Sequence, residues 1–383
     1  MTHVGIDIEQ FVTDPHGSGI QRVLQYLAKE WPVEGIVADF VVPWDGGHGL
    51  LTREQAADLL TIPFLPRGGE HDLREPVLAR IAEFDPVPLT DSELRDVFDA
   101  WLLAEVSYLP SVLRRFEDFA ERVPTVMIGY DTLPMSEPAN YRFRPGVAPW
   151  ASDYFRLLAT SRSVVCISDA ARDSILQVLR RDARLPISVA HPGGDHVPIR
   201  TPEPPDHPVF MRLGTLEARK RPVEIARAFR AAWEQGGMDD AELLFVGGHS
   251  HSDEEINRTI RDEVDRGGVR WIEGASDDEV TDLVHGSSAF LSIGVEGYGI
   301  PVLEAIRLGT PVLYDGIQPA AELMTGKGAQ RIDGLNGLGL SDAFRTWSAP
   351  EHLVTLWKQL EPGAVPTWRD FAGGIVEAVA TAR

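Results

Sequence analysis

A proline-rich segment near the middle of the chain constrains the fold more than any other feature. Five of the eleven residues in 198–208 are prolines, and proline interrupts both helices and central strands. On each side of this segment, short apolar runs alternate with amphipathic helical patterns. Such alternation indicates a parallel sheet with helices on both faces. The sequence therefore predicts an α/β fold of two doubly wound domains joined by a stiff linker.

The length of 383 residues also favours two domains over one compact core. We predict a first domain over residues 1–197, the linker over 198–208 and a second domain over 209–365. The last helix, within 366–383, has no strand after it and could pack anywhere, including back across the first domain. Within the first domain, the pattern over residues 92–122 is typical of a helix. Because Rossmann-like domains of this kind bind ligands between them, we expect an interdomain cleft.

Charge and cysteine content limit the classes of partner. The formal net charge of −22 repels nucleic-acid phosphates and anionic lipids, so we expect no nucleic-acid partner and at most weak, peripheral membrane contact. Cys166 is the single cysteine, which excludes an intrachain disulfide and fits a reducing compartment. The first residues lack the pattern of a secretion signal, and no apolar run reaches ~18 residues. We therefore expect a cytoplasmic protein with a small-molecule ligand.

The densest motif runs from Glu296 to Glu304 and reads Glu-Gly-Tyr-Gly-Ile-Pro-Val-Leu-Glu. An apolar strand ends before it, and Pro301 stands where the first turn of a helix favours proline. A helix N-terminus attracts anions such as phosphate, and the backbone amides that we place there are those of Gly297, Tyr298, Gly299 and Ile300. Carboxylates accept hydrogen bonds from vicinal hydroxyls, so Glu296 and Glu304 favour a sugar or ribose ligand. The alternative is a structural turn in which Glu304 only complements the helix dipole.

Clustered cations form a second candidate site. Arg219, Lys220 and Arg221 follow Gly214 in a loop at the carboxyl end of the first strand of the second domain. Adjacent cations in so acidic a chain suit a diphosphate. The alternative is a solvated basic cluster before a helix.

Candidates in the first domain are less specific. Gly17, Ser18 and Gly19 precede the first long helix, where a phosphate or sugar could approach, although a plain turn is the alternative. Asp131 follows a strand and could orient a hydroxyl or cap the next turn. His249 and His251 lack a third ligand, so no metal site is predicted.

These residues together resemble the family-four (group 1) retaining glycosyltransferases of the GT-B fold. Besides the motif from Glu296 to Glu304, the resemblance rests on segments that agree with the family in order, at residues 17–22, 166–172, 191–195, 214–220 and 244–248. It covers most of the chain and is much better in the second domain than over residues 45–120.

The resemblance implies a role for each candidate residue. Glu304 binds the nucleotide ribose, Arg219 and Lys220 hold the diphosphate, and Glu296 with the amides of residues 297–300 holds the donor sugar and β-phosphate. Glu296, Arg219 and Lys220 are thus the catalytic candidates. Further residues are implied along the donor, namely Gly214 and Gly247, and on the acceptor side, namely Gly17, Ser18, Gly19 and Asp131. No metal or cofactor is expected, because the cations and amides supply the charge stabilisation.

We therefore expect a retaining glycosyltransferase that moves a hexose or deoxyhexose from a nucleotide diphosphate sugar to the hydroxyl of an acceptor glycan or small molecule, as in polysaccharide biosynthesis. The alternatives are a GT-B-fold nucleotide-sugar epimerase and a non-catalytic nucleotide-sugar-binding protein. The family often carries His-Asp or His-Glu where this chain has Tyr130-Asp131, so the role of that histidine does not transfer. The nucleotide base, the acceptor and the oligomeric state do not follow from the sequence.

Overall fold

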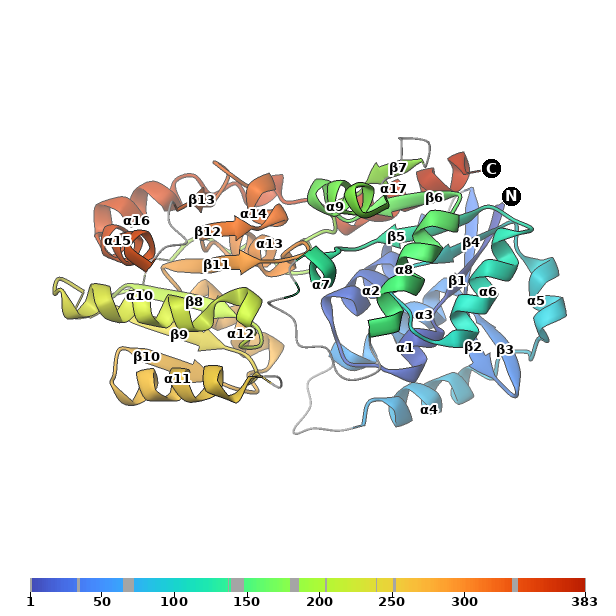
Figure 1. The fold of residues 1–383 in the computed structure, drawn as a ribbon, viewed down its shortest axis with the longest axis horizontal. Helices are drawn as coiled ribbons and strands as arrows, with labels where there is room; N and C mark the ends of the chain where they lie inside the picture. Colours follow the sequence, from blue (N-terminus) through green and yellow to red (C-terminus); the bar gives the residue numbers. More distant parts are fainter. Residues whose placement is uncertain are drawn as a thin grey trace. The chain divides into compact units, whose positions relative to one another are not determined.

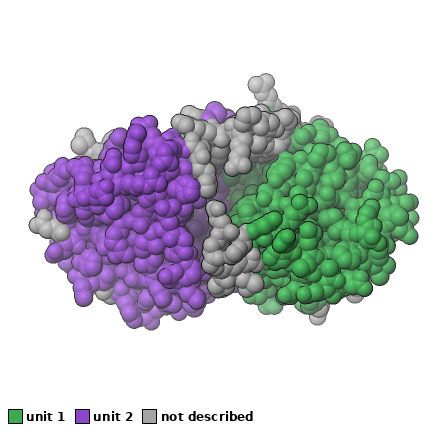
Figure 2. Space-filling view, turned by 90° about the horizontal axis from the view of Figure 1, so that it is seen from below, with its two compact units in different colours: residues 1–132, 143–192, 367–383 green, residues 133–142, 193–366 purple. Residues whose placement is uncertain are grey.

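The computed structural model describes residues 2–32, 35–64, 72–136, 138, 148–179, 186–203, 205–238, 240–250, 253–332 and 337–382. These residues form two compact units, coloured green (unit 1) and purple (unit 2) in Figure 2. Unit 1 combines residues 1–132, 143–192 and 367–383, and unit 2 combines residues 133–142 and 193–366. Each unit contains its own parallel-dominated sheet flanked by helices, which confirms the prediction of two α/β domains (Figure 1).

Unit 1 is built on a seven-stranded sheet with the order β3-β2-β1-β4-β5-β6-β7. Neighbouring strands pair in parallel except β2 and β3, which form an antiparallel hairpin. The strands are β1 (Thr2–Asp7), β2 (Ile36–Trp44), β3 (Gly47–Leu51), β4 (Ala100–Leu103), β5 (Thr125–Gly129), β6 (Ser163–Cys166) and β7 (Ile187–Val189). Its helices are α1 (Glu9–Thr13), α2 (Gly19–Glu30), α3 (Arg53–Leu59), α4 (Arg74–Phe84), α5 (Asp91–Val97), α6 (Pro110–Ala120), α8 (Ala148–Thr160) and α9 (Asp169–Leu179). The short helix α7 (Leu133–Ser136) lies between α6 and α8 in sequence but belongs to unit 2.

The predicted helix over residues 92–122 is wrong. Helices α5 and α6 lie there, but strand β4 separates them. This strand runs between β1 and β5 in the sheet, and all four of its residues are buried. A short apolar run between two helices has no period of its own, so the local pattern does not distinguish a strand from a helix.

Unit 2 contains a six-stranded, fully parallel sheet with the order β10-β9-β8-β11-β12-β13. Its strands are β8 (Val209–Leu213), β9 (Glu242–Val246), β10 (Val269–Ile272), β11 (Ala289–Val295), β12 (Val312–Ile317) and β13 (Ala329–Arg331). Its helices are α10 (Pro222–Glu234), α11 (Glu254–Asp265), α12 (Asp277–His285), α13 (Ile300–Arg307), α14 (Pro319–Leu323), α15 (Gly337–Trp347) and α16 (Pro350–Trp357). In the core, the ring of Phe344 meets those of Phe210 and Phe229 edge to face, at centroid distances of 5.1 and 5.3 Å.

The division between the units falls after residue 192, earlier than the predicted end of the first domain at residue 197. The backbone N–H of Gly194 donates to the carbonyl of Pro366 at 3.0 Å, and a Cβ at Gly194 would lie 2.5 Å from the Cβ of Leu303. The proline-rich segment also packs on unit 2, because the N–H of Arg200 donates to the carbonyl of Arg307 at 2.9 Å. The segment that begins at residue 193 is therefore part of the unit 2 surface.

The last helix, α17 (Trp368–Thr381), belongs to unit 1. The ring of Trp368 stacks on that of Tyr26 in α2 at a centroid distance of 4.8 Å. Close to its end, the carbonyl of Ala382 accepts a hydrogen bond from Arg162 at 3.3 Å. Helix α17 thus packs against residues that lie far earlier in the chain.

Candidate functional site

Two loops meet where the strand order of unit 2 reverses. Strand β8 has β9 on one side and β11 on the other, and a crevice forms at the carboxyl ends of strands at such a switch point. β8 leads through Gly214 to the short 3-10 helix Ala218–Lys220, and β11 leads directly into Glu296. The fold therefore brings Arg219, Lys220 and Glu296 into one site.

Glu296 is the centre of this site. Its Oε2 accepts a hydrogen bond from Arg219 at 2.5 Å, and its Oε1 lies 3.3 Å from Arg212 Nη2 and 3.7 Å from Lys220 Nζ. Arg219 also donates to the backbone carbonyl of Val295 at 3.0 Å, which fixes the guanidinium against the end of β11. The carboxylate therefore holds three cationic side chains in place.

The neighbouring cations keep Glu296 ionised. Burial alone would raise the pKa of Glu296, but Lys220, Arg219 and Arg212 together lower it to about 2. Burial lowers the pKa of Lys220, while Glu296 opposes the shift. With Glu217, which pairs with Arg219 at 2.6 Å, the site has three cations and two carboxylates. This excess of positive charge in an acidic protein favours an anion such as a diphosphate.

Glycines let the loops of the site approach each other closely. A Cβ at Gly214 would lie 2.5 Å from the Nζ of Lys220, and a Cβ at Gly247 would lie 2.5 Å from the carbonyl carbon of Gly214. Both glycines have positive φ, of +109° and +137°, which other residues rarely adopt. The two glycines that the sequence analysis expects along the donor therefore have a backbone conformation that only glycine fits.

The predicted helix start after Glu296 is α13, and Gly299 is its N-cap with a φ of +103°. The N–H of Val302 donates to the carbonyl of Gly299 at 3.0 Å. Tyr298 is buried, which raises its pKa. The amides at the start of α13 therefore follow directly on the Glu296 site, as an anion-binding turn requires.

Glu304, in the second turn of α13, has a partner that the sequence did not indicate. Nε2 of His196 lies 2.6 Å from Oε1 of Glu304, and the imidazole is almost completely buried. Arg307 Nε donates to the carbonyl of Val197 at 2.8 Å. The segment that follows residue 192 therefore runs along α13 and fixes the orientation of the Glu304 carboxylate.

The candidates of the first domain lie in unit 1. The N–H of Gly17 donates to Gln21 Oε1 at 2.9 Å, and the hydroxyl of Ser18 caps α2 by accepting from the N–H of Gln21 at 3.3 Å. Gly19 is the first residue of α2, and Asp131 follows β5. The Gly17 amide is thus engaged inside the loop, so it serves the loop's shape.

Sequence reasoning missed two residues of the unit 2 site. Arg212 lies in strand β8, where an arginine within an apolar strand is the one available signal. His196 ends the Gly-Gly-Asp-His stretch but carries no pattern that links it to Glu304. His249, considered above for a metal, pairs with Glu273 at 3.3 Å, and His251 lies outside the described residues.

Unit 1 has its own switch point, between β1 and β4, and Glu105 lies at the carboxyl end of β4. Its carboxylate is buried and accepts a hydrogen bond from the N–H of Phe11 at 3.0 Å. Burial raises the pKa of Glu105 to about 8; the Phe11 amide opposes the shift, and the charge of Asp7 adds to it. Glu105 is therefore largely protonated at neutral pH.

This shift makes stability depend on pH. The folded-state pKa of about 8 lies above the ordinary glutamate pKa of 4.5, so the stabilisation from Glu105 is complete below pH 4.5 and is lost as the pH rises through 8. In Glu105→Gln the neutral amide replaces the protonated acid. Between pH 5 and 9, the free energy of unfolding of this variant should therefore rise by roughly 4 kcal/mol relative to that of the wild type. Urea unfolding across this range measures it, with the exposed Glu255→Gln as control. Equal slopes in Glu105→Gln and the wild type would contradict the assignment.

Among the residues described, no helix is long and apolar enough to cross a membrane. The same residues contain no group of three or more histidine, cysteine or acidic side chains that could hold a metal ion.

A family comparison covers the residues of this site. The sequence model of the family described as "Glycosyl transferases group 1" matches residues 198–329, which include Arg219, Lys220, Glu296 and Glu304. The serotype-specific mannosyltransferase WbdA of Escherichia coli is 29% identical over 119 residues, which are 30% of this chain and 14% of that protein. The matched stretch is thus a small part of the relative's length.

Solved structures resemble the whole chain. The crystal structure of Anabaena Alr3699/HepE in complex with UDP and glucose covers 100% of both chains, with a TM-score of 0.65 and 14% identity. The apo form of the lipopolysaccharide outer core galactosyltransferase WaaB covers 100% of this chain and 99% of its own, with a TM-score of 0.62 and 14% identity. At such identity the likeness concerns the fold. The chain therefore has the GT-B fold, and its residues 198–329 match the sequence model of the group 1 glycosyl transferases.

Proposed function

We propose that this protein is a retaining glycosyltransferase that moves a hexose or deoxyhexose from a nucleotide diphosphate sugar to an acceptor hydroxyl. The observation that carries the proposal is the Glu296 site, in which one carboxylate holds Arg212, Arg219 and Lys220 beside the start of α13. The solved structure of HepE with UDP and glucose supports a nucleotide-sugar donor. The mannosyltransferase name of the WbdA relative supports a hexose.

Each group has a proposed task. Arg219, Lys220 and the first amides of α13 bind the diphosphate and stabilise the negative charge that grows on it as the glycosidic bond breaks. Glu296, ionised at any physiological pH, accepts hydrogen bonds from hydroxyls of the sugar, and Glu304 accepts those of the ribose. These cations and amides can supply the charge stabilisation without a metal ion.

Retention follows from attack on the face that the leaving group occupies. The acceptor oxygen forms the new bond to the anomeric carbon as the bond to the β-phosphate oxygen breaks, and a phosphate oxygen takes the acceptor proton. No protein nucleophile takes part, so the protein acts by positioning and by stabilising the leaving group. We also propose a cytoplasmic location, for which the single, buried Cys166 is the supporting feature.

The test is turnover of UDP-, GDP-, ADP- and dTDP-hexoses, with and without neutral saccharide acceptors, followed by NMR. A new glycoside with the anomeric configuration of the donor supports the proposal. An inverted product contradicts retention, epimerised donor without acceptor indicates an epimerase, and binding without turnover indicates a non-catalytic protein.

His196 provides a sharper test of donor binding. Without the imidazole, the Glu304 carboxylate loses a hydrogen bond of 2.6 Å, and bonds to charged groups contribute about 1.5–3 kcal/mol. His196→Ala should therefore raise the KM for the donor by roughly tenfold or more, with a smaller change in kcat. His196→Gln, whose amide nitrogen reaches the place of Nε2, should recover much of the loss.

The exposed His352 in α16 is the control, and His352→Ala should keep the KM of the wild type. A fall in kcat without a change in KM, or the same defect in His196→Gln and His196→Ala, would contradict the role given to His196.

A further inference from the structure

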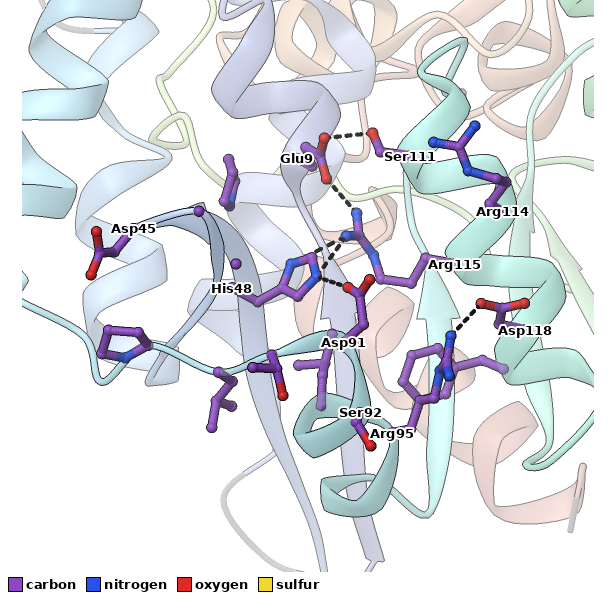
Figure 3. A pocket seen from close by; sticks show the side chains of 18 of the residues that line it. Glu9, Asp45, His48, Asp91, Ser92, Arg95, Ser111, Arg114, Arg115 and Asp118 are labelled. Atoms are coloured by element: carbon purple, nitrogen blue, oxygen red, sulfur yellow. Dashed lines mark hydrogen bonds and ion pairs between the residues drawn. The ribbon is translucent and has the colours of Figure 1, made fainter.

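Unit 1 contains a cavity that the proposed transfer site does not use. Its volume is about 790 Å³, within the range of small-molecule sites. The β2–β3 hairpin, the segment that leads into α5, and α6 form its walls (Figure 3). None of Gly17, Ser18, Gly19 and Asp131 lines it. The cavity is therefore a separate feature of this unit.

A network of polar groups, buried except for the exposed Asp91, forms one wall of the cavity. Arg115 Nε donates to Asp7 at 2.8 Å, and its Nη2 donates to Glu9. Nη1 of Arg115 lies 3.2 Å from Nδ1 of His48, and Nε2 of His48 lies 2.7 Å from Asp91. A guanidinium can only donate, so Nδ1 accepts and Nε2 donates to Asp91. These contacts hold the buried side chains of Arg115 and His48 in one orientation.

Two charged side chains at the cavity remain available for a ligand. Among the described residues, Arg114 and Asp45 have no ion-pair or side-chain hydrogen-bond partner. Figure 3 shows them on either side of the group formed by His48, Asp91 and Arg115. A ligand that spans the cavity would thus meet a donor on one side, an acceptor on the other and a fixed polar wall between them.

The charges of the lining select the class of ligand. Among the described residues that line the cavity, five carboxylates outnumber three guanidiniums. The carboxylates are those of Glu9, Asp45, Asp91, Glu117 and Asp118. This excess disfavours an anion, in a chain whose net charge is −22. The guanidiniums of Arg95, Arg114 and Arg115 disfavour a compact cation. A neutral ligand that both donates and accepts many hydrogen bonds remains.

Carbohydrates have this chemistry. Adjacent hydroxyls pair with carboxylates and guanidiniums, which bind in a bidentate manner. Apolar surface from Pro43, Pro88 and Leu89 also lines the cavity and suits the C–H face of a sugar ring. We propose that this cavity is a secondary binding site for a neutral carbohydrate, separate from the residues assigned to donor binding and independent of whether the chain transfers sugars.

The test is direct binding of methyl α-D-mannopyranoside, methyl α-D-glucopyranoside and methyl α-D-galactopyranoside, measured by NMR titration without a nucleotide sugar. Arg114→Ala removes a side chain with no partner in the described structure, so the fold should be unaffected. Asp91→Asn removes the charge beside His48 while keeping the side-chain shape. Each change should weaken binding of at least one glycoside about tenfold.

The chain offers a matched control for each variant. Arg258 is an exposed arginine of α11 that has no ion-pair or side-chain hydrogen-bond partner among the described residues. Asp277 follows the cap of α12 as Asp91 follows the cap of α5. Arg258→Ala and Asp277→Asn should bind as the wild type does. The proposal is overturned if none of the glycosides binds, if Arg114→Ala binds as well as Arg258→Ala, or if inorganic phosphate or putrescine displaces the glycoside from this site.

Discussion

Lys220→Ala is expected to reduce kcat for sugar transfer by about two to three orders of magnitude, the usual effect of removing one preorganised group that stabilises developing charge. The side chain of Lys220 is largely buried, and its Nζ lies 3.7 Å from Glu296, with Arg219 and Arg212 on the same carboxylate. The ammonium also lies close against Gly214, because a Cβ added there would lie 2.5 Å from Nζ. Steady-state kinetics with the donor found by the turnover screen measures the effect.

The same packing predicts that Lys220→Arg does not recover activity, since the larger guanidinium has no room beside Gly214. Lys327→Ala, at an exposed lysine of unit 2, is the matched control and should keep wild-type turnover. If Lys220→Ala retains more than about a tenth of the wild-type kcat, the charge-stabilising role proposed for this lysine is wrong.

Gly294→Ala is expected to be among the most destabilising single substitutions in unit 2. Gly294 has a φ of +103°, and its added Cβ would lie 2.1 Å from the backbone carbonyl oxygen of Arg219. Neither backbone can move without displacing the Glu296 site. Strain and overpacking together should cost about 4 kcal/mol, which urea unfolding and the thermal midpoint both measure.

Substitutions at two other glycines distinguish backbone strain from overpacking as the cause of this loss of stability. Gly274 has a φ of +71° with nothing near its Cβ position, so Gly274→Ala should lose only the conformational cost of about 1 kcal/mol. Gly248 has open space and no φ in the left-handed region, so Gly248→Ala should be nearly neutral. If Gly294→Ala is as stable as Gly274→Ala, the close contact between Gly294 and the backbone of Arg219 does not contribute to the stability of unit 2, and the prediction is wrong.

Local sequence signals predicted much of unit 2. The run that becomes β11, the glycine loop after it and the proline that opens α13 all lie close together in sequence, and each has its own turn or cap chemistry. The same holds for Gly214 and the cations that follow it. Their meeting at Glu296 follows from parallel strands, whose carboxyl ends lie at one edge of the sheet.

The features that the sequence did not predict depend on residues that lie far apart in the chain. Strand β4 was read as part of a helix because its burial between β1 and β5 depends on partners distant in the chain. His196 was assigned to the first domain, yet it contacts Glu304, a residue 108 positions later. The cavity of unit 1 combines residues from β3, α5 and α6, and no local pattern relates these elements.

The sequence by itself determined the α/β class, the two-domain organisation and the residue types of the donor-side site, because these depend on periodicity, turn chemistry and charge within short segments. Only the tertiary structure decided that Arg212 joins the cations on Glu296, that His196 orients Glu304, and that His48, Asp91 and Arg115 form one wall of a cavity. Each of these contacts depends on strand order and packing across the chain, and a hydrogen bond or buried ion pair forms only where folding places both partners within about 3 Å.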